Sequence, residues 1–381
     1  MRLPTFVSLF LLVISQTVLS SPCVSFDSSF NLLAFGLDGK DWNAGTQESW
    51  ANGTAADITA NGRPPFDGVN TTCYLAQFFN AVYVLNGNSS DSSAVHIYDA
   101  AGKSWSRQSV ITGSFDATNF AAILDHDTNV FYALSQGSLF YLNMGSMTSA
   151  NSTAISWIDA DKSPYPSSYT SPVMALAQNH IHFLDVPGVP AGSADIFVIH
   201  YNYFQPASQP YPVAGGGTIP ATQGKTASFF QAEGVQQEFA FIPEDGSATY
   251  VINVETNTTE AYTGPSTKDA AATYAASITA LVQLDSKGNV MFFPYTEGDV
   301  SVNTAATWTK VAAIAAVAPA TSSSASSSTT GTAGETQTII SGGGGPTTTG
   351  SASGHSSGSL AVRMSGPLAA AGLVGVLACV L

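Results

Sequence analysis

The sequence predicts an all-β fold in which copies of a four-stranded sheet stand around a ring. Two observations support this prediction. Short runs of β-branched and aromatic residues, such as 81–85 and 95–99, alternate with Asn, Gly and Ser, and runs of this kind form strands joined by tight turns. The pattern also repeats with a period near fifty residues, and such a period made only of strands is typical of a β-propeller.

In every copy a strand, a short turn and a second strand lead to a glycine. The repeat glycines are Gly36, Gly87, Gly137, Gly188, Gly246 and Gly298. Two more strand-like runs follow each glycine, for example 138–143 and 154–159, so each copy supplies a four-stranded sheet. One such sheet cannot bury both of its faces alone, whereas stacking around a ring does so. We therefore predict a six-bladed β-propeller over residues 21–316, with seven blades as the alternative if a loop region conceals one.

The position of the strands within a blade follows from their hydrophobicity. The first strand of each copy, such as 173–177, is the most apolar run. Strands that are buried on both faces have continuous apolar sequences. We therefore expect the first strands to lie next to the central channel and to be buried on both faces.

The N-terminal residues 1–20 differ from the repeats. They begin with Met1 and Arg2, continue with an apolar run at 6–14 and end at Ser20. A basic start, a short apolar run and modest side chains at the cleavage position are typical of a secretory signal peptide. The apolar run is short for a membrane span, so we expect the chain to be secreted and cleaved after Ser20.

The C-terminal part has two further segments. Ser, Thr, Gly and Ala dominate residues 317–356, a composition that predicts a disordered, O-glycosylated stalk because it cannot form a core. Residues 357–381 have the pattern of a GPI-attachment signal, in which a spacer and an uncharged apolar tail follow small residues around Ser356, the predicted attachment site. The mature protein would then lie on the extracellular face of the plasma membrane or in the cell wall.

The cysteines, sequons and charge fit an extracellular protein. Cys379 lies in the tail, which leaves Cys23 and Cys73 to form a disulfide in an oxidising compartment. Five N-glycosylation sequons lie in polar stretches between strands, at Asn52, Asn70, Asn88, Asn151 and Asn257. The formal net charge is −15, which argues against nucleic-acid binding because that function requires a basic surface.

The second copy carries a family resemblance. Asn86-Gly87, followed by Tyr98 and Trp105, resembles a kelch repeat with Asn-Gly in place of its Gly-Gly pair. The resemblance implies the architecture of kelch and galactose-oxidase-like propellers for residues 21–316. The opening stretch 23–47, with Cys-Val-Ser-Phe-Asp at 23–27 and Asn-Leu-Leu-Ala-Phe-Gly-Leu-Asp-Gly-Lys-Asp-Trp-Asn-Ala-Gly-Thr-Gln at 31–47, resembles a group of secreted, GPI-anchored fungal proteins of unassigned activity. This second resemblance implies a fold and a location, and it adds no catalytic residue.

Two histidine-containing segments are candidates for chemistry. Residues 125–127, Asp-His-Asp, could hold a metal or perform acid–base catalysis. They fall at a turn between two strands, where Asp and Asn side chains bond their own backbone, and we favour that structural role. His180 and His182 are two apart on one strand, so both should point to one face and could bind copper or zinc.

Copper radical chemistry would require more ligands than the sequence offers. A galactose-oxidase-like site uses two His, two Tyr and a Cys bonded to one Tyr, and the pairing of Cys23 with Cys73 leaves no such Cys. Glycoside hydrolysis requires two carboxylates across a sugar site, and among 26 acidic residues some pair always qualifies. No nucleophile elbow, zinc-binding helix or phosphate-binding loop is present in the sequence.

We therefore predict a cell-surface glycoprotein that binds a ligand, such as an extracellular carbohydrate or wall polymer, without catalysis and without a cofactor or metal. The alternatives are a carbohydrate-active enzyme, either a glycoside hydrolase or a copper oxidase, and a structural wall protein. Loop aromatics could stack on sugars or pack between blades, and we favour packing for Trp42, Trp50, Tyr165, Tyr169 and Tyr211.

The longest interblade loops are the predicted ligand site. They cover residues 53–72, 161–171, 214–225 and 263–273, and each runs from the last strand of one blade to the first strand of the next. Because a propeller's sheets are filled with side chains, specificity should lie in such loops, converging at one mouth of the channel. Their candidate ligand-binding residues are Arg63, Phe66, Asp67, Tyr165, Tyr169 and Lys268.

Overall fold

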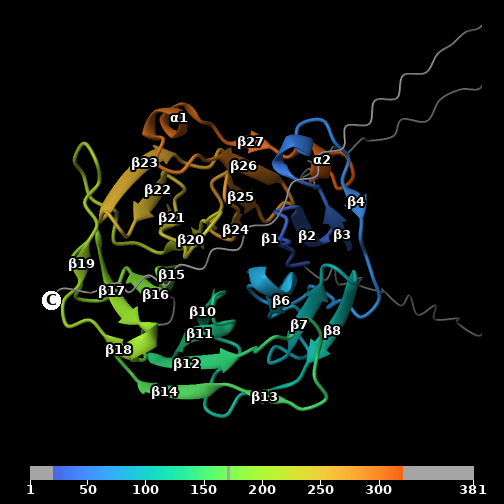
Figure 1. Cartoon of the computed structure of the whole chain (residues 1–381), viewed down its shortest axis with the longest axis horizontal. Helices are drawn as coiled ribbons and strands as arrows, with labels where there is room; N and C mark the ends of the chain where they lie inside the picture. The colour runs from blue at the N-terminus through green and yellow to red at the C-terminus, as the bar shows by residue number, and fades with distance from the viewer. Residues whose placement is uncertain (1–19, 170–171, 321–381) are drawn as a thin grey trace, which may run out of the picture. The chain divides into compact units, whose positions relative to one another are not determined.

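The computed structural model describes residues 20–169 and 172–320. By its internal contacts the chain divides into two units, Met1–Ser324 and Ala325–Leu381. The described residues all belong to the first unit, where six sheets form a ring of blades (Figure 1). This arrangement is the six-bladed β-propeller that the sequence predicts.

Each blade is an antiparallel sheet whose strands lie in sequence order. Blade 1 contains β1 (Cys23–Phe26), β2 (Leu32–Leu37), β3 (Lys40–Asn43) and β4 (Ala56–Asp57). Blade 2 contains β5 (Thr72–Ala76), β6 (Ala81–Leu85), β7 (Val95–Asp99) and β8 (Ser104–Gln108). Blade 3 contains β10 (Ala121–Asp125), β11 (Val130–Ser135), β12 (Ser138–Asn143) and β14 (Ile158–Lys162).

The second half of the ring repeats this plan. Blade 4 contains β15 (Val173–Ala177), β16 (His180–Leu184), β17 (Ser193–Val198), β18 (Tyr203–Phe204) and β19 (Gln209–Pro210). Blade 5 contains β20 (Gly224–Ser228), β21 (Glu238–Pro243), β22 (Ala248–Asn253) and β23 (Thr258–Thr263). Blade 6 contains β24 (Thr273–Ala276), β25 (Ala280–Leu284), β26 (Val290–Pro294) and β27 (Thr309–Lys310).

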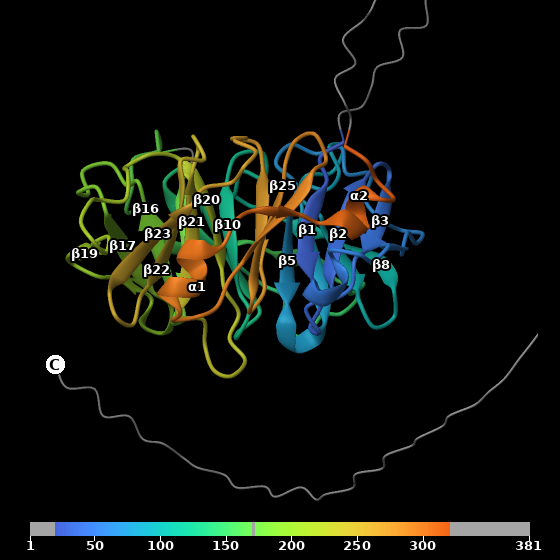
Figure 2. The ribbon, with the colours of Figure 1, turned by 90° about the horizontal axis from the view of Figure 1, so that it is seen from above.

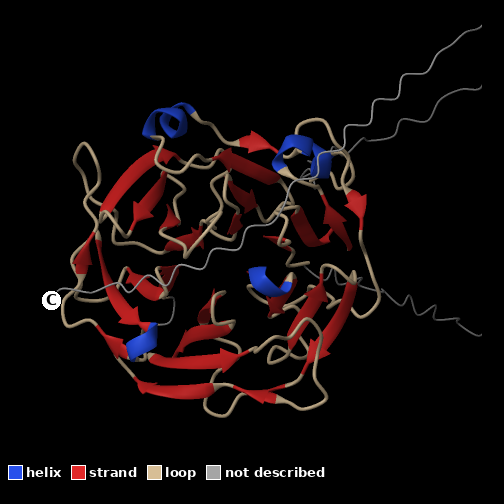
Figure 3. Ribbon diagram, viewed as in Figure 1, coloured by secondary structure: helices blue, strands red, loops and turns tan. Residues whose placement is uncertain are grey.

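The remaining elements are short, and all except α2, which follows β27, lie in the connections between strands (Figure 3). A two-stranded parallel sheet pairs β9 (Val110–Ile111) with β13 (Ile155–Ser156). The helical segments are the 3₁₀ turns η1 (Gln47–Ser49), η2 (Gln77–Phe79) and η3 (Ile199–Tyr201) and the helices α1 (Val300–Ala305) and α2 (Ala312–Ala315).

The repeat glycines of blades 1 to 5 lie at or after the end of the second strand, as the sequence predicts, whereas Gly298 follows β26, the third strand of blade 6. Gly36 illustrates the requirement, because its φ is +74° and an added Cβ would lie 2.6 Å from the Phe66 ring. That backbone conformation is strained for residues with a side chain. The glycine therefore lets the loop from blade 1 to blade 2 pack closely over the turn between β2 and β3.

The first strand of each blade lies innermost, as predicted. The strands β1, β5, β10, β15, β20 and β24 contact one another in turn around the ring. The expectation that they are buried on both faces is wrong for four of them, which contain half-buried residues and, in β20, an exposed one: β5, β10, β20 and β24. Two first strands, β1 and β15, are fully buried as expected, and the second strands β2, β6, β21 and β25 are fully buried too. The reason is positional, because an innermost strand borders the channel while the second strand lies between neighbouring blades.

The strand order gives the ring two distinct faces (Figure 2). Each blade has four antiparallel strand positions in order, and in blade 4 the outermost position is shared by β18 and β19, which both pair with β17. Every connection from one blade to the next therefore emerges on the same side. We name this side the interblade face. The turns that join first and second strands, such as 27–31, 126–129 and 229–237, emerge on the opposite side, which we name the hairpin face.

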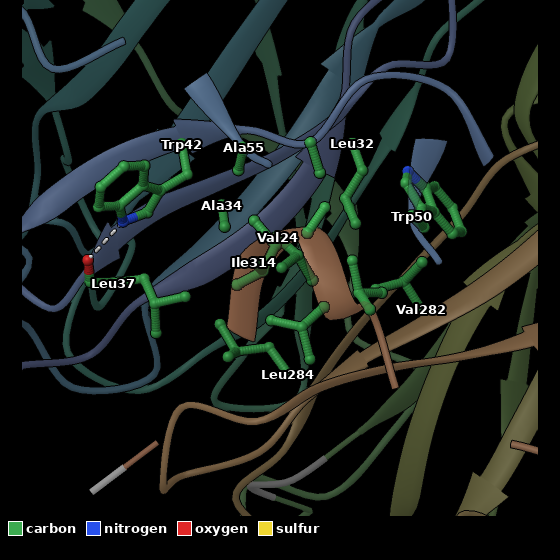
Figure 4. Packing of buried hydrophobic residues seen from close by; sticks show 14 of the residues in the cluster. Val24, Leu32, Ala34, Leu37, Trp42, Trp50, Ala55, Val282, Leu284 and Ile314 are labelled. Carbon is green, nitrogen blue, oxygen red and sulfur yellow. Dashed lines mark hydrogen bonds between the residues drawn. The ribbon is translucent and has the colours of Figure 1, made fainter. Parts of the chain in front are cut away.

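The ring closes through helix α2, which packs between blades 6 and 1. Ile314 is buried in a cluster with Leu32, Leu284 and Val282 (Figure 4). The backbone N–H of Ala313 donates to the carbonyl oxygen of Trp50 at 3.0 Å. Closure therefore depends on a C-terminal helix that packs against the first blade, in addition to contacts between the innermost strands β1 and β24.

Cys23 on β1 and Cys73 on β5 form the predicted disulfide, with their Cα atoms 5.9 Å apart. The bond joins blades 1 and 2 at the start of the ring. Within residues 20–169 and 172–320, no helix has the length and hydrophobicity to cross a bilayer. The predicted signal peptide (except Ser20), GPI signal, Ser356 and nearly all of the stalk lie outside the described residues and stay predictions.

Candidate functional site

A cavity of about 390 Å³ lies at the centre of the ring. The innermost strands of all six blades line it, through residues 23–26, 72–75, 121–124, 173–176, 224–228 and 273–276. These strands pair only with the second strand of their own blade in the described part of the chain. Their other edges, with backbone N–H and C=O groups, therefore face the cavity.

Two side chains bridge neighbouring innermost strands around this wall. The Tyr74 hydroxyl donates to the carbonyl oxygen of Ala122 at 2.9 Å, and the Thr226 hydroxyl donates to the carbonyl oxygen of Met174. These bonds satisfy two of the backbone carbonyl groups on the free strand edges. The rest of the wall offers hydrogen-bonding groups to whatever occupies the cavity.

The loop 229–237 closes the cavity on the hairpin face. Phe230 extends from blade 5 and contacts the rings of His126 in blade 3 and Phe30 in blade 1, at centroid distances of 5.2 and 5.6 Å. The loop is held from both sides, because Phe230 N–H donates to Ser277 of blade 6 and Gln236 C=O accepts from Gln178 N–H of blade 4. In Figure 2 this yellow loop projects from the lower side of the ring.

Several polar side-chain atoms of the cavity lining are buried without a partner. At the closed end they are His126 Nδ1 and Gln236 Oε1, whose residues are 3% and 5% exposed. Nearer the interblade face they are Asn86 Oδ1 and Thr273 Oγ1. A buried polar atom without a hydrogen bond is costly. Unpartnered groups lining a cavity therefore indicate a place for a polar occupant, water or ligand.

His126 is an acceptor at this site. Its Nε2 lies 3.4 Å from Asp127 Oδ1, which leaves Nδ1 as the acceptor when the ring is neutral. Burial lowers the pKa of His126, and the nearby carboxylates of Asp127 and Asp125 oppose this shift. The exposed ring of Phe78 stacks on His126 with a centroid distance of 5.9 Å.

The open end of the cavity lies on the interblade face. Its rim includes the exposed residues Asn70, Thr118, Asn119 and Lys225. Among the described lining residues, Lys225 alone carries a formal charge at neutral pH, and no Asp or Glu is present. A second cavity of about 220 Å³ adjoins the rim and shares Lys225, and its wall contains Glu244 and Asp269.

The six residues predicted to bind ligand lie at three separate blade junctions and line neither cavity. Arg63 pairs with buried Asp41 at 2.8 Å, and its guanidinium lies over the ring of Phe66, 5.0 Å from the centroid. Phe66 itself is buried, and Asp67 accepts a hydrogen bond from Ser89 N–H. These groups thus join loop 58–71 to the neighbouring turns.

The other three predicted residues are also held by local contacts. The rings of Tyr165 and Tyr169 pack against each other at 5.2 Å, and both are buried. The Tyr169 hydroxyl donates to the carbonyl oxygen of Leu184 at 2.9 Å. Lys268 lies in the loop between blades 5 and 6, beside Gly246 of blade 5. Rings in these loops fill the wedge between blades, so they offer no face for stacking on a ligand.

The other residues that the sequence analysis considered for a functional role make contacts that stabilise the fold. Residues 125–127 end β10 and begin a turn, in which the Asp125 carboxylate accepts from Thr128 Oγ1 and Asp127 N–H. Packing of the loop aromatics is confirmed, because all five are buried: Trp42, Trp50, Tyr165, Tyr169 and Tyr211.

His180 and His182 have different environments. His182 Nδ1 lies 2.9 Å from the buried Tyr211 hydroxyl, and burial lowers the pKa of His182 to about 3. The His180 ring faces His200, with a centroid distance of 5.8 Å. Among the described residues, no three His, Cys, Asp or Glu side chains gather as a metal site would require.

Sequence reasoning missed the residues of the central cavity. Gln236, Thr273 and Phe230 belong to no motif, and the cavity forms only when six strands from distant parts of the chain meet. One signal was available, because the polar content of 224–228, Gly-Lys-Thr-Ala-Ser, is unusual for an innermost strand. Such a sequence indicates a strand that borders a polar space.

The chain matches no family model and no curated protein sequence. A fungal alcohol oxidase of the AA5 family in complex with copper has a TM-score of 0.39 and 8% identity, with 72% of this chain and 58% of that chain covered. Hsv2 of Kluyvelomyces marxianus has a TM-score of 0.39 and 13% identity, with 74% of this chain and 75% of that chain covered. A nidogen/laminin complex has a TM-score of 0.38 and 7% identity, with 62% of this chain and 77% of that chain covered. These distant similarities assign the chain to no family, and the propeller is established by its own six sheets.

Proposed function

We propose that this chain is a secreted, GPI-anchored surface glycoprotein whose propeller binds carbohydrate in its central cavity without catalysing a reaction. The observation that carries the proposal is a cavity whose described lining has no carboxylate and has two buried, unpartnered acceptors, His126 Nδ1 and Gln236 Oε1. Sugar hydroxyls are donors that suit such acceptors. Glycoside hydrolysis would use two carboxylates, and the described lining of this cavity contains none.

The proposed location rests on the sequence. Residues 1–20 resemble a signal peptide and residues 357–381 a GPI-attachment signal, and the stretch 23–47 resembles secreted, GPI-anchored fungal proteins. The exposure of sequon asparagines is compatible with glycosylation, since Asn52, Asn70, Asn151 and Asn257 are exposed and Asn88 is half-buried. The anchor would present the propeller to wall polymers and extracellular glycans.

A glycan array tests the proposed function. Full-length protein is purified in a detergent without a sugar headgroup and applied to arrayed mono- and oligosaccharides, including wall polysaccharide fragments. We expect selective binding to a small set of neutral glycans, with no release of reducing sugar. Binding to no glycan would contradict the proposal, and release of reducing sugar would favour a hydrolase.

A further inference from the structure

Phe230 lies across one end of the central cavity, which would restrict how a chain-like ligand can enter. On the hairpin face, Phe230 lies over the centre and contacts blades 1 and 3. Its loop is fixed by backbone hydrogen bonds to blades 4 and 6. A glycan that enters from the interblade face cannot pass through the ring, so its chain must end inside the cavity.

The unpartnered atoms of the lining select a class of ligand. Asn86 Oδ1, His126 Nδ1 and Gln236 Oε1 are acceptors, and Thr273 Oγ1 can accept or donate. An occupant rich in donors satisfies them. A cationic donor is disfavoured, because the described lining offers no carboxylate and carries Lys225 at its rim. Neutral hydroxyl groups fit both conditions.

The size of the cavity and its apolar part further limit which ligands fit. A volume of about 390 Å³ lies at the lower end of the range for ligand pockets, roughly 300–1,000 Å³. The half-buried Phe230 ring at the closed end offers an apolar surface for the C–H face of a sugar ring. The space therefore suits one or two sugar rings better than a longer segment.

We infer that the cavity recognises the terminal end of a neutral glycan, whose last ring rests on Phe230 and donates hydroxyl hydrogen bonds to Gln236 and His126. This inference rests on the proposed function and specifies its ligand. Asn70, a sequon residue on the rim, would hold an attached N-glycan beside the entrance. The remainder of a bound chain extends outward past Lys225 on the interblade face.

A length series tests chain-end recognition. Titration calorimetry of the full-length protein uses the oligosaccharide bound best on the array, in lengths of one to six rings. We expect the affinity to rise up to about two or three rings and then to stay constant, because further rings lie outside the cavity. An affinity that keeps rising with length would contradict the inference, because it indicates binding along an open surface.

Substitutions at the closed end provide the second test. Gln236→Leu removes an acceptor without a partner in the free protein, so folding should be unaffected, while the affinity should fall at least tenfold. The matched control is Gln231→Leu in the same loop, whose amide bonds Glu297 at the surface and whose loss should leave the affinity unchanged. Phe230→Ala should remove the side chain that covers the hairpin-face end of the cavity. The affinity should then increase with the length of the glycan.

The outcomes separate the inference from the proposed function. If the wild-type protein binds no glycan, both are overturned. If it binds glycans and Gln236→Leu leaves the affinity unchanged, glycan binding by the propeller survives, whereas recognition of the chain end at Gln236 is overturned. Thermal unfolding of each variant, compared with that of the wild type, shows whether a loss of affinity reflects lost folding.

Discussion

The Cys23–Cys73 disulfide closes a loop with a sequence separation of 50 residues between blades 1 and 2. In the chain-entropy account, a cross-link of this length stabilises a protein by about 4 kcal/mol by restricting the unfolded chain. We expect the double variant Cys23→Ala, Cys73→Ala to lose approximately that free energy of unfolding in denaturant titrations. Labelling of the native wild-type protein with a thiol reagent should detect no free thiol, and two reactive thiols would contradict the assignment.

His96 provides a pH-dependent contribution to stability. It is 3% exposed and its Nδ1 has no partner, and burial lowers its pKa to about 4, below the ordinary value of about 6.5. The unfolded chain therefore binds the proton first as the pH falls. The stability due to neutral His96 is present above pH 6.5 and is lost as the pH falls toward 4.

We therefore expect the Tm of the wild type to fall relative to that of His96→Leu by about 3 °C or more between pH 7 and pH 4.5. Thermal unfolding of both proteins over this range measures the difference. The comparison removes the contributions of other titrating groups, which the two proteins share. Parallel curves for the two proteins would refute the assignment of this pH dependence to His96.

His126 marks the limit of prediction for single residues. The turn at 125–127 could be predicted because Asp and Asn side chains bond to backbone groups only a few residues away along the chain. The contact between His126 and Phe230 joins turns of blades 3 and 5, and no local pattern encodes it. For the same reason the burial of Phe66 was not predicted, because it depends on how closely blades approach at their junctions.

Among the elements, the strands were the most predictable. Their alternating turns and repeat glycines gave the six blades with the first strand innermost, because these patterns follow from local propensity and a regular period. The role of α2 was not predictable in this way. Ala312–Ala315 is one short turn, and its importance comes from packing against blade 1, which is far away in sequence.

Helix α2 should therefore be essential for ring closure. Ile314 is 1% exposed and packs with residues of blades 1 and 6. Truncation of a buried Ile to Ala costs about 2–5 kcal/mol, so Ile314→Ala should lower the free energy of unfolding by that amount in denaturant titrations. The control Val300→Ala changes a 45% exposed side chain on α1 and should stay within about 0.5 kcal/mol of the wild type. Equal effects of both substitutions would argue against closure by α2.

For the whole molecule, the proposed anchor determines where the propeller works. We expect a phosphatidylinositol-specific phospholipase to release the protein from membranes. Leu373→Asp should abolish anchoring, because it places a charge in the apolar tail that the attachment machinery recognises. Fractionation and mass spectrometry of the mature C-terminus measure both outcomes. A mature protein that retains residues 367–381 would contradict the anchor.

The account of the whole molecule depends on one claim, that the ligand occupies the central cavity and not the outer loops. A crystal structure of the protein with the oligosaccharide bound best on the array tests this claim most directly. We predict density for a terminal sugar ring against Phe230, within hydrogen-bonding distance of Gln236 Oε1 and His126 Nδ1. Density on the loops that carry Arg63 or Lys268, with only water in the central cavity, would contradict the account.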